Sequence, residues 1–131
     1  MGAWGYFNFD NDAAADFAGD FRDNHTEAML YEALATASEE EGYLEVDEAS
    51  EALAAAEIVA AILGKPAKDF PADLIPVILK LDASESEDLR DLAIEAVEAV
   101  VKKSELQEMR SETDDYANWQ QLQQDLLARL K

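Results

Sequence analysis

Glu57 has the most unusual setting of any residue in the sequence, because it is the single charged group within the apolar stretch of residues 52–64. A helix that is hydrophobic on every face belongs inside a domain. Burial of a carboxylate without partners costs several kcal/mol or forces the group to take up a proton. Glu57 is therefore either a tuned general acid or base in a pocket, or a structural group held by partners from elsewhere in the chain.

The structural interpretation of Glu57 is favoured because an acid–base site needs a second titrating group, and the sequence identifies none. The N-terminal segment is rich in hydrogen-bond donors and is predicted to have no helix of its own. We therefore expect Glu57 to hold Trp4 and Gly5 in place. The candidate partners are three arginines, one indole N–H and a set of backbone amides: Arg22, Arg90, Arg110, Trp4 and residues 2–6.

The sequence gives little support for a nucleophilic active site or for a zinc site. The chain has no cysteine and one histidine, His25, which lies in a predicted turn between two helices. No Gly-x-Ser-x-Gly elbow and no His-x-x-x-His pair accompanies it, and a serine nucleophile or a zinc site needs such partners. We expect His25 to be a turn or capping residue.

The sequence Asp10-Asn11-Asp12 resembles the oxygen-rich start of a calcium-binding loop. An EF-hand also needs a glycine at its sixth position and a glutamate at its twelfth, where this chain has Ala15 and Phe21. N-capping of a helix by Asp10 or Asn11 explains the same residues, so no metal and no cofactor is expected. A weaker interpretation keeps metal binding open for Asp10, Asp12, Asp16 and His25.

The formal charge of −20 is distributed unevenly. Residues 1–64 carry 15 acidic side chains and a single base, Arg22, whereas residues 65–131 carry 15 acidic and 9 basic ones. Such a field repels nucleic acids and anionic membranes and attracts a basic protein. Adaptation to a salty cytoplasm, or solubility alone, is an equally weighted explanation.

The elements that must position these residues are predicted to be all helical, because glycine and proline are rare and no alternating β pattern occurs. We expect one domain over residues 1–131, with six or seven helices around a central apolar helix at 47–63 capped by Asp47. An extended aromatic segment precedes them, and Pro76 is expected to break or kink a helix. No stretch of 18 residues is free of charge, so no membrane span is expected. The remaining helices are expected at 12–22, at 26–38, after a capping box at 84–87, at 104–110 with a second capping box at 104–107, and from Thr113 or Asp114 onward.

Several segments resemble a bacterial family known as domain of unknown function 4259. The resemblance rests on the opening Met-Gly-Ala-Trp-Gly and on the segments 9–17, 41–45, 54–61 and 104–106. Met109 departs from the Leu-Trp pair expected after Ser-Glu-Leu. The resemblance implies a small, mostly helical, cytoplasmic bacterial domain, with no activity or site residues to carry over.

Two functions remain open at this point. The favoured one is a non-enzymatic interaction domain, of an inhibitor or immunity type, that covers a basic partner. The alternative is a hydrolase or small-ligand site, with or without a metal, built on Glu57 with Asp10, Asp12 and Asp16. It requires these carboxylates to converge in one concave pocket.

Overall fold

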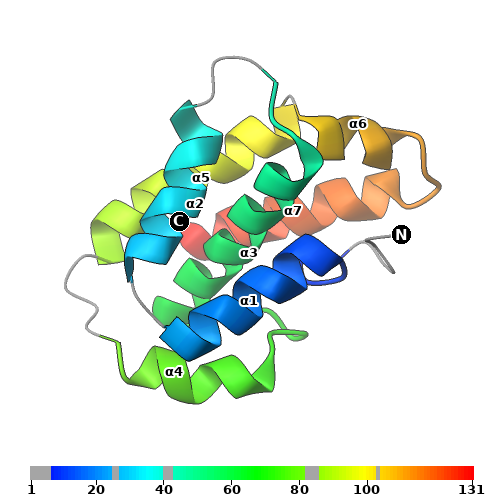
Figure 1. Cartoon of the computed structure of the whole chain (residues 1–131). Coiled ribbons are helices and arrows are strands. Elements are labelled where there is room, and N and C mark those ends of the chain that lie inside the picture. The colour runs from blue at the N-terminus through cyan, green and yellow to red at the C-terminus, as the bar shows by residue number, and fades with distance from the viewer. Residues whose placement is uncertain (1–6, 25–26, 40–42, 82–85, 103) are drawn as a thin grey trace.

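The computed structural model describes residues 7–24, 27–39, 43–81, 86–102 and 104–131. Within these ranges the chain is an all-α bundle of seven α-helices and one 3₁₀ turn (Figure 1), which confirms the predicted fold class. The elements in chain order are α1 (Asp12–Asn24), α2 (Glu27–Glu39), α3 (Val46–Ile62), η1 (Ala72–Leu74), α4 (Ile75–Leu79), α5 (Ser86–Lys102), α6 (Glu105–Ser111) and α7 (Tyr116–Leu130).

Helix α3 forms the centre of the bundle, as its uniformly apolar sequence predicts. It packs against α1, α2, α5, α6 and α7, and 12 of its 17 residues are buried. Many of these residues are alanines, whose small side chains let neighbouring helices approach the α3 backbone closely. The central position of α3 brings residues from both ends of the chain against one helix.

The ends of α1 and α3 follow local capping chemistry. The Asn11 side chain accepts a hydrogen bond from the Ala14 N–H at 2.8 Å, which identifies Asn11 as the cap of α1. The predicted Asp47 cap is wrong, because α3 begins one residue earlier and the Glu48 carboxylate accepts from the Glu45 N–H at 3.3 Å. Gly64 ends α3 with a φ of 88°, a conformation that favours glycine.

The chain between α3 and α5 forms a short helical corner. Pro76 lies in the first turn of α4, where a proline is tolerated, so it starts this helix and breaks none. Residues 7–10 form a turn, in which the Asp10 N–H donates to the Phe7 carbonyl at 3.0 Å. The Phe9 ring meets buried Phe70 edge to face at 5.9 Å, which docks the turn on this corner. Residues 1–6, predicted to be extended and aromatic, lie outside the described ranges.

Helix α6 is anchored beside the start of α3. Leu44 and Ser104 form an isolated bridge, the Leu44 carbonyl accepts from the Glu105 N–H at 2.8 Å, and the Glu105 carboxylate accepts from the Val46 N–H at 2.8 Å. The Ser104 hydroxyl caps α6 by accepting from the Gln107 N–H at 3.0 Å, as its capping box predicts. These bonds fix the N-terminal end of α3 close to α6.

One helix boundary differs from the sequence expectation, and another lies largely outside the described residues. Helix α7 begins at Tyr116, later than the predicted Thr113 or Asp114, because the Thr113 hydroxyl instead donates to the Arg110 carbonyl at 2.7 Å. The predicted capping box at 84–87 falls largely outside the described residues.

Among the described helices, none combines the length and the apolar character needed to cross a membrane.

The alanine packing of α3 leads to a stability prediction. Ala55 is fully buried, so Ala55→Leu forces neighbouring helices apart and is expected to cost about 1–3 kcal/mol of unfolding free energy. Urea denaturation followed by circular dichroism measures this cost. The control is Ala15→Leu at an exposed position of α1, and equal stability of the two variants would contradict the close packing.

Candidate functional site

Glu57 lies in a buried polar cluster that joins three parts of the chain. Arg129 of α7 donates from Nη1 to Glu57 Oε1 at 2.9 Å and from Nη2 to Glu57 Oε2 at 3.3 Å. Asn8 Nδ2 donates to Glu57 Oε2 at 2.8 Å, and Gln123 Nε2 donates to Asn8 Oδ1 at 2.7 Å. The Glu57 side chain is only 3% exposed and the Arg129 side chain 21%, so this carboxylate is paired and hydrogen-bonded where it is buried.

The cluster supports the structural interpretation of Glu57 and corrects its predicted arginine partners. Arg22 pairs with Asp73 at 2.9 Å and Arg90 with Asp91 at 3.3 Å, on other parts of the surface. Arg110 lies on α6, near the opposite end of α3. The partner is Arg129, which sequence reasoning missed because a basic residue in the last turn of a helix is well explained by the helix dipole. Trp4 and Gly5, the other predicted partners, lie outside the described residues.

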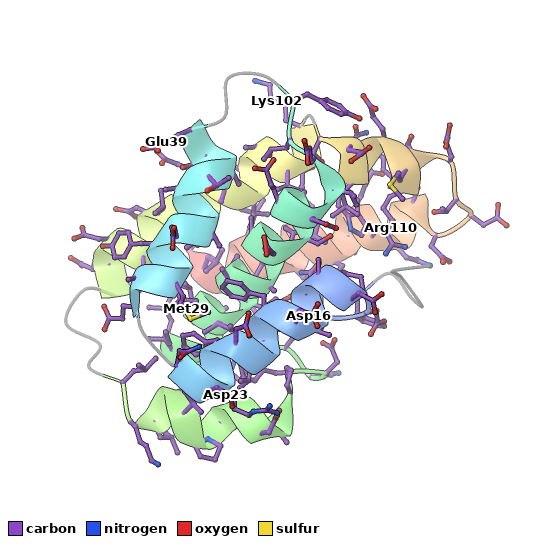
Figure 2. The ribbon with its side chains drawn as sticks, viewed as in Figure 1. Asp16, Asp23, Met29, Glu39, Lys102 and Arg110 are labelled. Carbon is purple, nitrogen blue, oxygen red and sulfur yellow. The ribbon has the colours of Figure 1, made fainter. Side chains whose placement is uncertain are left out.

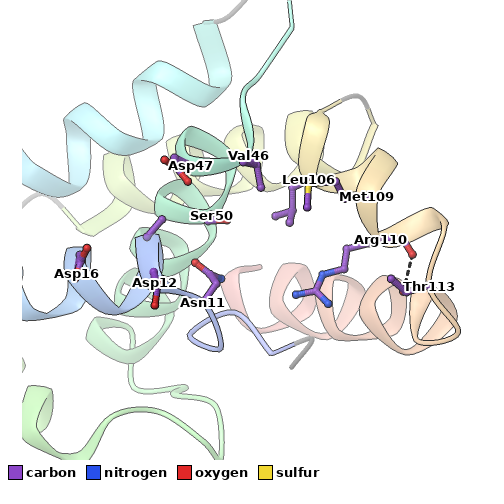
Figure 3. A pocket seen from close by; sticks show the side chains of 11 residues that line it. Asn11, Asp12, Asp16, Val46, Asp47, Ser50, Leu106, Met109, Arg110 and Thr113 are labelled. Carbon is purple, nitrogen blue, oxygen red and sulfur yellow. Dashed lines mark hydrogen bonds between the residues drawn. The ribbon is translucent and has the colours of Figure 1, made fainter. Parts of the chain in front are cut away.

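A pocket of about 530 Å³ opens where the N-terminal ends of α1 and α3 face α6 (Figure 3). One wall is acidic and polar, with side chains from α1 and α3, and the other wall is formed by α6 and the residues that follow it. The lining residues are Asn11, Asp12, Ala13, Asp16, Val46, Asp47, Ser50, Leu106, Met109, Arg110 and Thr113. Its size falls in the range of about 300–1,000 Å³ that is typical of small-ligand pockets.

The acidic wall continues beyond the pocket. Burial raises the pKa of the half-buried Glu51, and the carboxylates of Asp47, Glu48 and Asp20 raise it further. This effect requires the carboxylates of α1 and α3 to lie close enough to repel one another. We use the name acidic face for this set, which consists of Asp12, Asp16 and Asp20 of α1 and Asp47, Glu48 and Glu51 of α3; Figure 2 shows the position of Asp16 on α1.

Of the basic residues near the acidic face, one is paired with a carboxylate and another lines the pocket. Arg22, the single base of residues 1–64, is bound to Asp73, and this hydrogen bond raises the pKa of its guanidinium. Arg110 is the one basic residue among those lining the pocket, and burial lowers its pKa. The carboxylates of Asp115 and Asp10 act on the pKa of Arg110 in the opposite direction.

The predicted site residues thus separate into two groups. Asn11, Asp12 and Asp16 line the pocket, whereas Asp10 and Glu57 are not among its lining residues. His25 lies outside the described residues, and within those ranges no group of three or more histidine, aspartate or glutamate side chains is arranged to hold a metal ion. Sequence reasoning missed Val46, Ser50 and Arg110 as pocket residues, since their grouping depends on the contact between the start of α3 and α6.

The sequence profile of the family described as Domain of unknown function (DUF4259) matches residues 2–122. The chain belongs to this family. Searches of curated proteins and of solved structures each found no significant match. The DUF4259 match covers α1 to α6 and more than a third of α7, so it includes the complete pocket lining and Glu57, Asn8 and the start of α7. Arg129 lies beyond the matched range.

The buried ion pair gives a stability prediction for this DUF4259 protein. Glu57→Ala leaves Arg129 and Asn8 without their acceptor, so we expect a loss of about 3 kcal/mol in unfolding free energy. Thermal and urea denaturation measure it, with Glu51→Ala as the matched carboxylate control. Similar, small changes in both variants would contradict the structural role of Glu57.

The raised pKa of Glu51 gives a prediction on the pH dependence of stability. A carboxyl group with a raised folded-state pKa stabilises the fold at low pH, and this contribution is lost as the pH rises through that pKa. Glu51→Gln is therefore expected to be more stable than the wild type at pH 7, by less than about 1 kcal/mol because solvent screens the half-exposed group. The difference should shrink below the folded-state pKa, and denaturation curves at pH 7 and pH 4 check it. A destabilised Glu51→Gln variant at pH 7 would contradict the repulsion.

Proposed function

We propose that the domain is a non-enzymatic interaction module that binds a basic protein through its acidic face. The observation that carries the proposal is the grouping of carboxylates from α1 and α3 on the acidic face, where Asp47, Glu48 and Asp20 raise the pKa of Glu51 in addition to its burial. Positive groups on a partner would lower this repulsion and accelerate encounter through the long-range field. A cytoplasmic location in a bacterial cell is part of the same proposal.

The separation of Glu57 from the pocket also supports a binding role over a hydrolytic one. Arg129 and Asn8 occupy both oxygens of Glu57, and the residue does not contribute to the pocket lining. A general acid or base must reach a bound substrate within hydrogen-bond distance. The carboxylates that do line the pocket are Asp12, Asp16 and Asp47, and they suit the attraction of a cation.

A pull-down from native lysate tests the proposal with matched variants. The bait variant Asp16→Asn/Asp20→Asn removes two charges from the acidic face, and Glu95→Gln/Glu98→Gln removes two exposed charges from α5. We expect a basic protein that is captured by the wild type and by the α5 variant at about 50 mM salt, and is released near 500 mM, where the Debye length falls to a few ångströms. The acidic-face variant should capture much less.

Two outcomes would contradict the proposed function. One is the absence of any salt-sensitive basic partner. The other is an equal loss of capture in both double variants, because this would assign the interaction to the total charge of the protein and not to the acidic face. Circular dichroism of each bait establishes that the variants are folded.

A further inference from the structure

Helix α4 and the 3₁₀ turn before it are apolar on the side that faces solvent as well as on the side that faces the core. Leu74 is 1% exposed, and Val77 and Ile78 pack against the core. A helix that is hydrophobic on every side is normally covered on every side, but the outer side of this one is exposed. We use the name α4 stripe for its exposed apolar residues, which are Ala72, Ile75, Pro76 and Leu79.

The α4 stripe is one continuous surface. Its members follow the spacing i, i+3, i+4 and i+7, which places them along one side of a helix. Leu79 is 79% exposed, the largest fraction among the large hydrophobic side chains that the structure describes, and Ile75 is 38% exposed. Figure 1 shows α4 at the edge of the bundle. Single exposed apolar residues are common, whereas a continuous apolar surface marks an interaction site.

Two charged residues flank the α4 stripe at its opposite ends. Asp73 and Lys80 are both exposed, and their separation of seven residues places them on the same side of the stripe. Asp73 accepts a hydrogen bond from Arg22 at 2.9 Å, and a carboxylate has further lone pairs for a second donor. Residues 65–81 carry three lysines and two aspartates, so this part of the chain lacks the negative excess of the whole.

The flanking charges make the α4 stripe complementary to a second copy of itself. When two α4 helices pack antiparallel about a two-fold axis through the middle of the stripe, the same side of each helix lies together with its ends reversed. The Asp73 carboxylate of one copy then lies opposite the Lys80 ammonium of the other, and the symmetry repeats this pair. The apolar side chains meet between the two pairs.

We propose that the α4 stripe is a self-association surface, through which two copies of this chain form a weak antiparallel dimer aligned by two Asp73–Lys80 pairs. Burial of the apolar side chains supplies the affinity, whereas exposed ion pairs set the orientation and add little energy. We expect a dissociation constant on the order of 100 µM, because an interface based on one short helix falls below the roughly 1,000 Å² of a stable complex. The dimer does not use the acidic face, so it is independent of the proposed function.

Sedimentation velocity of the full chain tests the proposal between roughly 10 and 500 µM, concentrations that bracket this dissociation constant. Each copy carries a formal charge of −20, so the two repel each other at a distance. Salt screens this repulsion, and we expect the dimer fraction to rise from about 50 mM to about 500 mM salt. Capture of a basic protein by the acidic face changes with salt in the opposite direction.

A variant of the most exposed member connects the dimer to the α4 stripe. Leu79→Ser is expected to weaken dimerisation about a hundredfold, because a symmetric dimer loses the buried side chain from both copies. The matched control is Met109→Ser, at a 50% exposed side chain of α6 on another edge of the bundle (Figure 1), and it should dimerise as the wild type does. Circular dichroism establishes that both variants are folded.

Two charge variants test the orientation of the helices. Asp73→Lys places positive charges opposite each other in its own dimer, and Lys80→Asp places negative charges there. Each variant alone is expected to dimerise about tenfold more weakly than the wild type at about 150 mM salt, since like charges at close range oppose association. In an equimolar mixture of the two variants opposite charges face each other at both pairs, so dimerisation should return to about the wild-type strength.

Four results would overturn the proposed dimer: a monomer at every concentration, a dimer that weakens as salt rises, dimerisation of Leu79→Ser at the wild-type strength, or a mixture of the charge variants that associates no better than either alone. Another occupant would be recognised by its own signature. Binding of neutral phosphatidylcholine vesicles or of an unrelated protein by a monomeric wild type, and its loss in Leu79→Ser, would assign the α4 stripe to that occupant and overturn self-association.

Discussion

The buried carboxylate of Glu57 is the constraint on which the arrangement of this fold depends. Removal of a charged group from water is costly, and the cost is offset only when the pairing geometry is good and the remaining lone pairs are satisfied. Glu57 meets these conditions through Arg129 and Asn8, while Arg129 also donates to the Lys65 carbonyl at 3.2 Å. These hydrogen bonds connect four segments around one ion pair: the turn at residues 7–10, the middle of α3, the residues that follow α3, and α7. A well-packed apolar pair would give comparable stability, but it would lack the directional hydrogen bonds that orient α7 relative to α3.

The alanine-rich sequence of α3 makes such an arrangement possible. The two ends of this helix have different surroundings. Small side chains let α5 and α2 approach the buried part of α3 closely. Around Glu57 the polar groups are enclosed and neutralised. At the N-terminal end of α3, by contrast, a pocket opens between this helix, the start of α1 and the short helix α6. The buried ion pair of Glu57 and the acidic wall of the pocket thus lie at different positions along the same helix.

The parts of this structure that depend on local chemistry could be predicted from the sequence, and the parts that depend on long-range contacts could not. The central apolar helix was predicted to within one residue at each end, and the Ser104 cap and the helix end at Gly64 likewise follow from neighbouring residues. A buried partner for Glu57 was expected, but its identity depends on a residue 72 positions away on another helix. Nothing local distinguishes Arg129 from an ordinary cation at a helix C-terminus. The pocket likewise depends on the bridge between Leu44 and Ser104.

The placement of Glu51 bears on why this protein is so acidic. Charge that serves solubility alone is best carried by carboxylates that water surrounds and screens. Glu51 is half-buried, and the carboxylates of Asp47, Glu48 and Asp20 raise its pKa after burial does. The folded state therefore disfavours the ionised form of Glu51, which is a poor arrangement for simple solvation. A cation that approaches the acidic face would relieve this repulsion. The same physical features that weaken the free protein would strengthen its complex with a basic partner.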